Sequence, residues 1–400
     1  MKRRRILTTA IFLAAVLRTE SSHAAGFTLT TNSSTAQTIS GTSANTGTVN
    51  ASVILNIASG SGIPVTMSGG TAGSPTTLVN NGTIQVTGTG SGRAVQTLNA
   101  SNGSVLVIQN NLGATIFTIN NDTVAAGTGS GAQATTVASV ALTNAGTIES
   151  AAGGQAVNFN KILNGAANSV VNSGLLKATG SDAVRPGLNG TISNSGTIQS
   201  IAVSGSSSDG VDLQTTSNGV VITNASNWSA GSPLTPGTGL IDGGRHGITG
   251  GPTTNIAFTT SITNNLGGTI RGNNGSGINL DGLSGLQTAT IINGGTITGN
   301  GQNIGNGLSH DGDGIDVDGL VNITNTGIIR SINSFNIAAD GGLGDAKLDG
   351  EGFEIAASAL GEEFFQAGLA FGDEHELVGS WQLAVGSWQK MQSICFAASL

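Results

Sequence analysis

The stretch Thr191-Ile-Ser-Asn-Ser-Gly-Thr-Ile-Gln-Ser200 holds two short apolar alternations separated by an Asn-x-Gly turn. Ile192 and Ile198 are β-branched and would face one way, whereas Ser193 would face the other. Asn and Gly are residues of tight turns, and Gly196 can adopt the positive φ that many such turns need. The stretch therefore predicts a strand, a turn and a second strand, with one narrow face to bury.

The same unit recurs along most of the chain, and its most constant residue is an asparagine. The aligned residues are Asn80, Asn110, Asn144, Asn172, Asn194, Asn224, Asn264, Asn293 and Asn325. Successive markers are 22 to 40 residues apart. Self-similarity with a period of about 20 to 50 residues is typical of solenoids and propellers, and variable spacing around a constant unit indicates insertions on one side.

A second motif, a small residue followed by an apolar one, interleaves with the first, as in Asp182-Ala-Val184 and Asp209-Gly-Val211. Most repeats therefore hold at least two strand sites. The patterns of leucine-rich repeats, helical arrays and propeller blades are absent from the sequence. We predict an all-β fold, a parallel β-helix forming a right-handed solenoid, with aliphatic side chains inside and asparagines stacked in a ladder. Nine rungs about 4.8 Å apart would give a rod about 40 Å long.

Four segments follow from the pattern. Residues 1–24 read as a signal peptide, because four cationic residues at 2–5 precede an apolar run at 6–17 and small residues precede Ala25. Residues 25–75 are rich in Thr, Ser and Gly and are interpreted as an N-terminal capping region. The β-helix repeats occupy 76–335, and 336–400 form an atypical C-terminal tail, expected to be irregular or partly helical.

Composition narrows the classes of function. Only 9% of the residues are charged, Tyr is absent and the single cysteine is Cys395. Removal of residues 1–24 takes away five positive charges and one negative charge, so the net charge falls from −8 to −12. No nucleic-acid partner is expected, because phosphate binding needs clustered Lys and Arg. One cysteine forms no internal disulfide, so stacked strands must supply the stability.

The repeated Asn-x-Gly-Thr-Ile and Asp-Gly-Ile/Val units behind a signal peptide resemble the passenger domains of bacterial autotransporters, over residues 25–335. The resemblance implies a right-handed parallel β-helix that is carried to the outer-membrane surface of a Gram-negative cell. It implies an adhesin more often than a protease or esterase. The expected partners are host or neighbouring-cell surfaces, through glycans or protein receptors.

The C-terminal tail departs from the autotransporter pattern. A complete autotransporter ends in a β-barrel of long amphipathic strands with aromatic girdles, and residues 341–400 do not show that pattern. Trp381 and Trp388 sit in two echoing Gly-Ser-Trp-Gln units instead. We interpret the tail as truncated or altered in reading frame. A separate outer-membrane barrel would then be needed for surface display, and the periplasm is expected where none is supplied.

Four carboxylates gather near the end of the repeats, at Asp311, Asp313, Asp316 and Asp318. Several oxygen ligands in a short segment suit Ca²⁺, which makes these residues a candidate metal site. The segment does not match an EF-hand loop, because the twelfth position from Asp311 is Asn322 rather than a bidentate carboxylate. Exposed carboxylates are screened within about 8 Å at physiological salt, so we expect Ca²⁺ affinity in the millimolar range at best.

A catalytic alternative uses the same segment. Asp313-Gly-Ile-Asp316 resembles the acidic motif of polygalacturonases, which are β-helix enzymes with paired carboxylates, and His246 lies in a Gly-Arg-His-Gly sequence that echoes theirs. The order of the two motifs along the chain is reversed, however, and His246, His310 and His375 have no metal-ligand spacing. The sequence therefore favours a non-catalytic adhesive rod with no cofactor, and a carbohydrate-active enzyme is the alternative.

Overall fold

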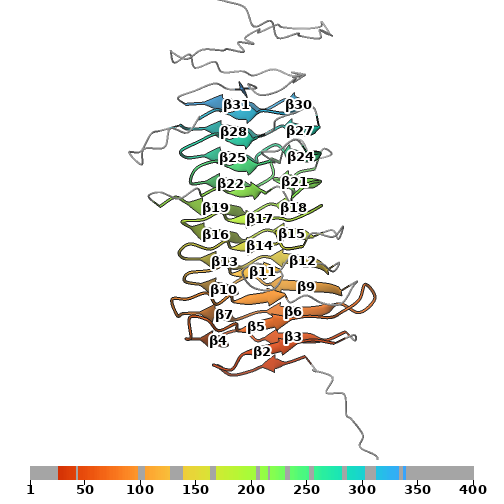
Figure 1. Cartoon of the computed structure of the whole chain (residues 1–400), viewed down its shortest axis with the longest axis vertical. Coiled ribbons are helices and arrows are strands. Elements are labelled where there is room, and N and C mark those ends of the chain that lie inside the picture. The colour runs from red at the N-terminus through yellow and green to blue at the C-terminus, as the bar shows by residue number, and fades with distance from the viewer. Residues whose placement is uncertain are drawn as a thin grey trace, which may run out of the picture.

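The computed structural model describes residues 26–338, except 42–43, 98–103, 127–137, 163–167, 204–207, 215–216, 230–234, 252–255, 282–285, 302–311 and 333–336. The described chain forms a rod of three parallel sheets, with the N-terminal strands at one end and the C-terminal strands at the other (Figure 1). This confirms the predicted all-β parallel β-helix. The signal peptide and nearly all of the C-terminal tail lie outside the described residues.

The three sheets are named A, B and C. Sheet A contains β1 (Thr28–Leu29), β3 (Thr46–Val49), β6 (Thr76–Asn80), β9 (Ser104–Asn110), β12 (Ala138–Asn144), β15 (Ser169–Asn172), β18 (Thr191–Asn194), β21 (Val220–Asn224), β24 (Phe258–Asn264), β27 (Gln287–Asn293) and β30 (Leu320–Asn325). Sheet B contains β4 (Ile54–Ile57), β7 (Thr83–Val86), β10 (Thr115–Thr118), β13 (Thr147–Ser150), β16 (Leu175–Thr179), β19 (Thr197–Ile201), β22 (Leu240–Gly243), β25 (Thr269–Gly272), β28 (Thr296–Gly299) and β31 (Ile328–Ser331). Sheet C contains β2 (Gln37–Ile39), β5 (Val65–Met67), β8 (Val95–Thr97), β11 (Val124–Ala126), β14 (Val157–Asn158), β17 (Val184–Arg185), β20 (Val211–Leu213), β23 (Ile248–Gly250), β26 (Ile278–Leu280), β29 (Ile315–Val317) and β32 (Ile337–Ala338).

One rung visits the three sheets in turn. The chain leaves β18 in sheet A, turns into β19 in sheet B, continues to β20 in sheet C and returns to β21, which pairs with β18. The stretch 191–200 is therefore not a hairpin, because its two strands belong to different sheets and each pairs with a neighbouring rung. Strands β1 to β5 pair with later strands in the same three sheets, so residues 28–67 form the first rungs of the rod.

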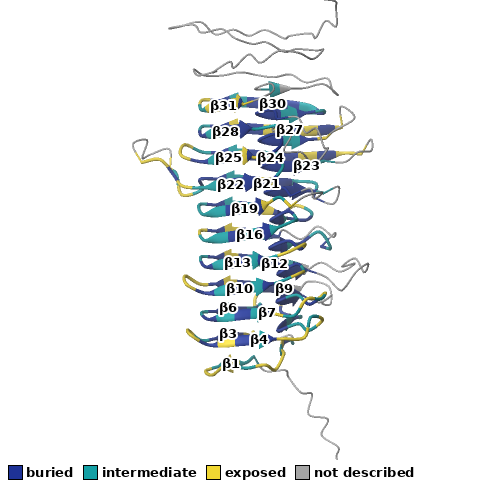
Figure 2. Ribbon diagram, turned by 90° about the vertical axis from the view of Figure 1, so that its left-hand side faces the viewer, coloured by how far each residue is buried: buried dark blue, intermediate teal, exposed yellow. Residues whose placement is uncertain are grey.

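The core follows from the alternation of side chains along each strand. Ile192 and Ile198 are buried, with relative exposures of 2% and 0%. Parallel pairing stacks Ile192 on Ile222 and Ile198 on Ile241, so equivalent aliphatic residues form continuous columns inside the rod. Buried strands alternate with more exposed turns along the whole length (Figure 2). Because each rung repeats the same inward positions, the core is one column rather than a globular cluster.

The nine marker asparagines form the predicted ladder, all of them buried at the C-terminal ends of sheet A strands from β6 to β30. In the first eight of them, the side-chain Nδ2 donates to the Oδ1 of the asparagine in the next rung, with N···O distances of 2.7–2.9 Å. The same nitrogen also donates to backbone carbonyls at the turn, as Asn194 does to Gly196 and Leu240. The ladder therefore satisfies both the side chains and the buried backbone at this corner.

The glycine of the Asn-x-Gly turn is needed for a different reason from the one predicted. Glycines with positive φ among the described residues do not include Gly174 or Gly196, so the expectation of a positive φ at Gly196 is wrong. A Cβ added at Gly196 would lie 2.2 Å from the carbonyl oxygen of Gly174, and one at Gly174 would lie 2.1 Å from that of Gly146. Glycine is required because the turns of successive rungs stack with their backbones in contact.

Candidate functional site

A column of polar side chains runs beside sheet C, at the corner where the chain arrives from sheet B. Its members each lie two residues before the first apolar residue of a sheet C strand, and we call them the polar column: Asp122, Gln155, Asp182, Asp209, His246, Ser276 and Asp313. All are buried, with relative exposures of 7% or less. Polar groups buried in this way need hydrogen-bond partners, which the stacking of rungs supplies.

The members are joined by hydrogen bonds from rung to rung. Asp182 Oδ1 accepts from the backbone N–H of Asp209 at 3.1 Å, and Asp209 Oδ1 accepts from that of His246 at 2.9 Å. His246 Nδ1 in turn accepts from the backbone N–H of Ser276 at 2.8 Å. Because an acceptor nitrogen carries no proton, this contact requires neutral His246 protonated at Nε2. Each of these three side chains therefore accepts a hydrogen bond from the backbone of the next rung.

Three arginines form ion pairs with carboxylates of the column, and the pair between Arg93 and Asp122 is the longest, at 3.6 Å. Arg185 on β17 contacts Asp182 Oδ2 at 2.6 Å through Nη2 and Asp212 Oδ2 at 3.1 Å through Nε. Arg245 binds Asp209 with both carboxylate oxygens engaged, at 2.6 Å and 3.0 Å. Paired contacts of this kind fix the geometry of a guanidinium and a carboxylate more strongly than a single ion pair does. The side chains of Arg185 and Arg245 remain about a quarter exposed, at 26% and 25%.

Asp212 lies on β20, outside the polar column, and its carboxyl has a strongly shifted pKa. Burial, followed by the negative charge of Asp182, raises the pKa of Asp212 to about 7, although Arg185 acts in the opposite direction. Ionisation is unfavourable because two carboxyls share one guanidinium in a region that excludes water. A strongly shifted carboxyl is common at catalytic sites and in structural ion-pair networks alike. Here Asp212 is only 6% exposed, so its carboxyl offers little surface to a substrate.

The predicted acidic segment divides between different environments. Asp313 belongs to the polar column and is buried, whereas Asp316 lies outward on β29 and Asp318 follows that strand, both half-buried. Asp311 lies outside the described residues, as do His310 and His375. Among the residues that the structure describes, no group of three or more His, Cys, Asp or Glu side chains is placed to hold a metal ion. The candidate Ca²⁺ site therefore remains a prediction.

The structure places the two polygalacturonase-like motifs in relation to each other. His246 and Asp313 belong to one column, two rungs apart, because β23 pairs with β26 and β26 with β29. The sequence did not single out Asp182, Arg185, Asp209, Asp212 or Arg245 as a group. The available signal was the position two residues before each sheet C strand, where a side-chain acceptor recurs in rung after rung.

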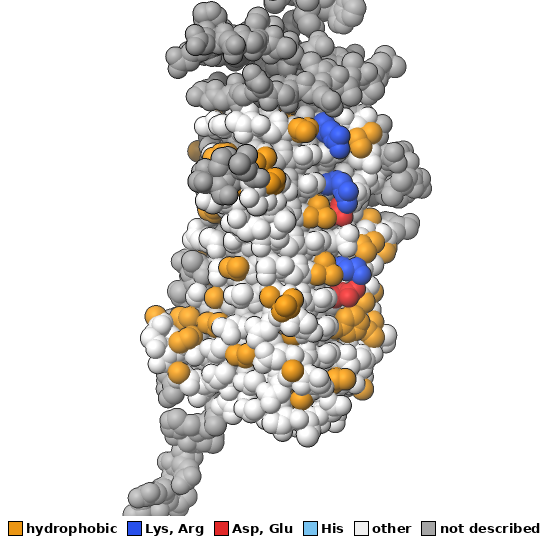
Figure 3. Space-filling model, turned by 180° about the vertical axis from the view of Figure 1, so that it is seen from behind, with side chains coloured by type: hydrophobic (Ala, Val, Ile, Leu, Met, Phe, Trp, Pro, Cys, Tyr) orange, Lys and Arg blue, Asp and Glu red, His pale blue; other side chains and the backbone are white. Residues whose placement is uncertain are grey.

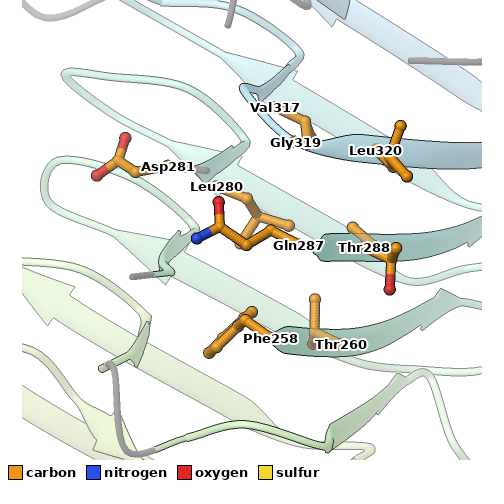
Figure 4. A pocket seen from close by; sticks show the side chains of 10 residues that line it. Phe258, Thr260, Leu280, Asp281, Gln287, Thr288, Val317, Gly319 and Leu320 are labelled. Carbon is orange, nitrogen blue, oxygen red and sulfur yellow. The ribbon is translucent and has the colours of Figure 1, made fainter. Parts of the chain in front are cut away.

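A separate pocket lies between sheet A and sheet C near the C-terminal rungs (Figure 4). It is lined mainly by Phe258, Leu280, Gln287, Val317 and Leu320. Asp281 borders the pocket, and burial raises the pKa of its carboxyl. Its cavity volume of about 10 Å³ is far below the range of about 300–1,000 Å³ that is usual for small-molecule sites. The pocket is a shallow depression between rungs.

Comparisons with protein-family models, with curated proteins and with solved structures found no match to this chain. The resemblance to autotransporter passengers therefore rests on the sequence motifs alone. No helix of the described residues is long and apolar enough to span a membrane.

Proposed function

We propose that the chain is an exported, non-catalytic β-helical rod that adheres to cell surfaces, in the manner of an autotransporter passenger domain. The observation that carries this proposal is the repetition of outward positions along three sheets of 11, 10 and 11 strands. A rod of this kind presents the same kind of side chain every 4.8 Å or so, over about 50 Å. Weak contacts repeated along such a face combine into useful avidity.

The state of the buried polar groups also supports a structural role. The carboxylate oxygens of Asp182 and Asp209 accept hydrogen bonds from arginine side chains and from backbone N–H groups of the next rung. Both carboxylates are 1% exposed. A catalytic carboxylate must reach a substrate atom within hydrogen-bond distance, which burial of this degree prevents without rearrangement. The column therefore fits a role in holding rungs together.

Two measurements test the proposal. N-terminal sequencing of envelope material should give a chain that begins Ala25-Gly26-Phe27, and intact Met1 in the cytoplasm would contradict export. The purified chain, fluorescently labelled, should bind intact cells saturably. Treating the cells beforehand with protease or with glycosidases then distinguishes protein receptors from glycans. Absence of saturable binding to any cell surface tested would contradict the adhesive role.

A carbohydrate-active enzyme is the second candidate, and the raised pKa of Asp212 is the observation that favours it. A general acid needs a pKa near the working pH, and about 7 meets that requirement. Release of reducing ends from polygalacturonate and other acidic glycans would test it, with Asp212→Asn and Asp313→Asn as the variants. Hydrolysis by the natural chain that both variants lose would favour the enzyme over the rod.

A further inference from the structure

The strands of sheet A carry no charge. None of the eleven contains Asp, Glu, Lys or Arg. One outward column of sheet B, by contrast, contains Glu149, Lys177, Asp242, Arg271 and Arg330. Viewed from behind, the rod shows its charged side chains in one vertical file (Figure 3). Water that lies on the strands of sheet A therefore meets hydroxyl, amide and aliphatic groups.

Threonine is the commonest outward residue on β18, β21, β24, β27 and β30, where parallel pairing sets the outward side chains in three columns. The column beside the asparagine ladder contains Ser193, Thr223, Thr263, Ile292 and Thr324. The middle column contains Thr191, Val221, Ser261, Thr290 and Asn322. The third column contains Thr259, Thr288 and Leu320. We call these thirteen residues the threonine face, and all of them are half-buried or exposed.

The threonine face is regular, and its hydroxyl groups are left to solvent. Its strands stand one above the other along the rod (Figure 1). The asparagine ladder borders the face on every rung, and side-chain ladders of this kind allow a sheet to stay flat over many strands. The hydroxyls of Thr223, Thr263, Thr288, Thr290 and Thr324 have no hydrogen-bond partner among the described residues. They can therefore bond only to what lies on the face.

The spacing of the threonine face is close to that of crystalline water. In ice each oxygen has four neighbours in a tetrahedron, so O–H···O bonds of about 2.75 Å place next-nearest oxygens about 4.5 Å apart and give a repeat of about 7.3 Å in the perpendicular direction. Neighbouring rungs are about 4.8 Å apart, and alternate residues of one strand are about 6.6 Å apart. When the two repeats are aligned at the centre of the face, on β24, the outermost rungs differ by about 0.6 Å and the outer columns by about 0.7 Å. Side-chain rotation can take up displacements of this size.

We propose that the threonine face binds the surface of ice. Its hydroxyls donate and accept hydrogen bonds with water of the lattice, and the methyl groups between them leave water to bond with other water. A charged side chain would orient water around itself instead, and the face has none. Aromatic residues and arginine, the usual anchors for a protein partner, are also absent from the thirteen positions. This binding goes beyond the adhesive role proposed above and does not depend on it.

Slow freezing of a dilute solution of the purified full chain tests the proposal. Growing ice excludes ordinary solutes, whereas a protein bound to its surface is overgrown, so the chain should enter the ice fraction while a dye dissolved with it stays in the liquid. Thr263→Lys, on the middle strand of the face, should lower this incorporation at least about tenfold. A tenfold loss corresponds to about 1.4 kcal/mol, and removing an unpaired ammonium group from liquid water costs more than that.

Thr269→Lys is the matched control. Thr263 and Thr269 are both half-buried residues of one rung, but Thr269 lies on β25 in sheet B, so its replacement should leave incorporation unchanged. Thr290→Lys, at an exposed position on β27, replaces Thr263→Lys if circular dichroism shows that variant to be unfolded. Exclusion of the natural chain from ice would overturn the proposal. Equal losses in the sheet A and sheet B variants would overturn its assignment to the threonine face.

Discussion

Replacing Asn194 with alanine should destabilise the rod more than replacing Asn325, although both asparagines belong to the same ladder. Asn194 is fully buried in the middle, where its Oδ1 accepts from Asn172 at 2.8 Å and its Nδ2 donates to Asn224 at 2.8 Å. Asn325 ends the described ladder, where its Oδ1 accepts from Asn293 at 2.7 Å and its Nδ2 donates to the backbone carbonyl of Gly327. The middle variant therefore loses two ladder bonds and the end variant loses one.

The magnitude follows from the groups that are left behind. A buried hydrogen bond contributes about 1 kcal/mol, and a buried polar group left without a partner costs about 1–3 kcal/mol. In Asn194→Ala, Asn172 Nδ2 keeps its contacts with the carbonyls of Gly174 and Thr197, but Asn224 Oδ1 loses its donor. We expect a loss of about 2–4 kcal/mol for Asn194→Ala and about 1 kcal/mol for Asn325→Ala. Asn194→Asp should lower the free energy of unfolding more than either alanine variant. A carboxylate cannot donate to Gly196 O, Asn224 Oδ1 and Leu240 O, which all accept from Asn194 Nδ2.

Local measurement is needed, because a solenoid does not unfold in a single two-state step. Hydrogen exchange of the amides in β18, β19 and β21 should accelerate in Asn194→Ala by roughly 30- to 1,000-fold, and those in distant rungs should change less. Chemical denaturation gives the global loss. Equal losses for Asn194→Ala and Asn325→Ala would refute the ladder as a chain of side-chain bonds, and so would a loss below about 0.5 kcal/mol in the middle variant.

Three further expectations concern the core, the polar column and the acidic segment. Ile198→Asp should cost several kcal/mol, because it buries an unpaired charge, whereas Thr197→Asp on the outward side of the same strand should cost less than about 1 kcal/mol in urea titrations. The free energy of unfolding should fall as pH rises from 5 to 8, because the folded pKa of Asp212, about 7, exceeds its unfolded value of 3.8 and the stability of the protonated form is lost on ionisation. The Asp212→Asn variant mimics the protonated form and should remove this pH dependence. An unchanged pH dependence in that variant would contradict the assignment to Asp212. Calorimetry should detect only millimolar Ca²⁺ binding, and micromolar binding that disappears in the Asp313→Asn, Asp316→Asn double variant would establish a true metal site.

The sequence was sufficient for the fold because stacked rungs impose local rules that each repeat must obey. Ile192 and Ile198 alternate with polar neighbours, and the marker asparagines recur at one corner because an unpaired amide there would be buried. Gly196 was recognised as a turn residue for the wrong physical reason. Its φ is not positive. The true constraint is the carbonyl oxygen of Gly174 in the preceding rung, 2.2 Å from where a Cβ would lie, and this is a contact between residues of different repeats.

The Asp–Arg network could not be predicted in the same way. Asp182 and Asp212 meet through Arg185 only because β17 pairs with β20, and the repeats between markers range from 22 to 40 residues. Residues outside the constant unit therefore have no fixed sequence distance to their neighbours in the next rung. Register in sheet C depends on where each variable connection ends, which the alternation of side chains does not specify.

Positions in the polar column need a side chain that can accept a hydrogen bond, and this requirement can be looked for in a sequence. The backbone N–H at its corner needs an acceptor from the preceding rung, and Asp182, Asp209 and His246 supply one with different chemistry. The position therefore selects for an acceptor rather than for one residue type, which is why no motif marks it. Because the acceptors at this corner are used in stacking, they contribute to the stability of the rod, and the recognition that we propose would use the outer faces. Of the three sheets, A is the one whose strands contain no Asp, Glu, Lys or Arg, so recognition through that face would depend on hydroxyl, amide and aliphatic groups.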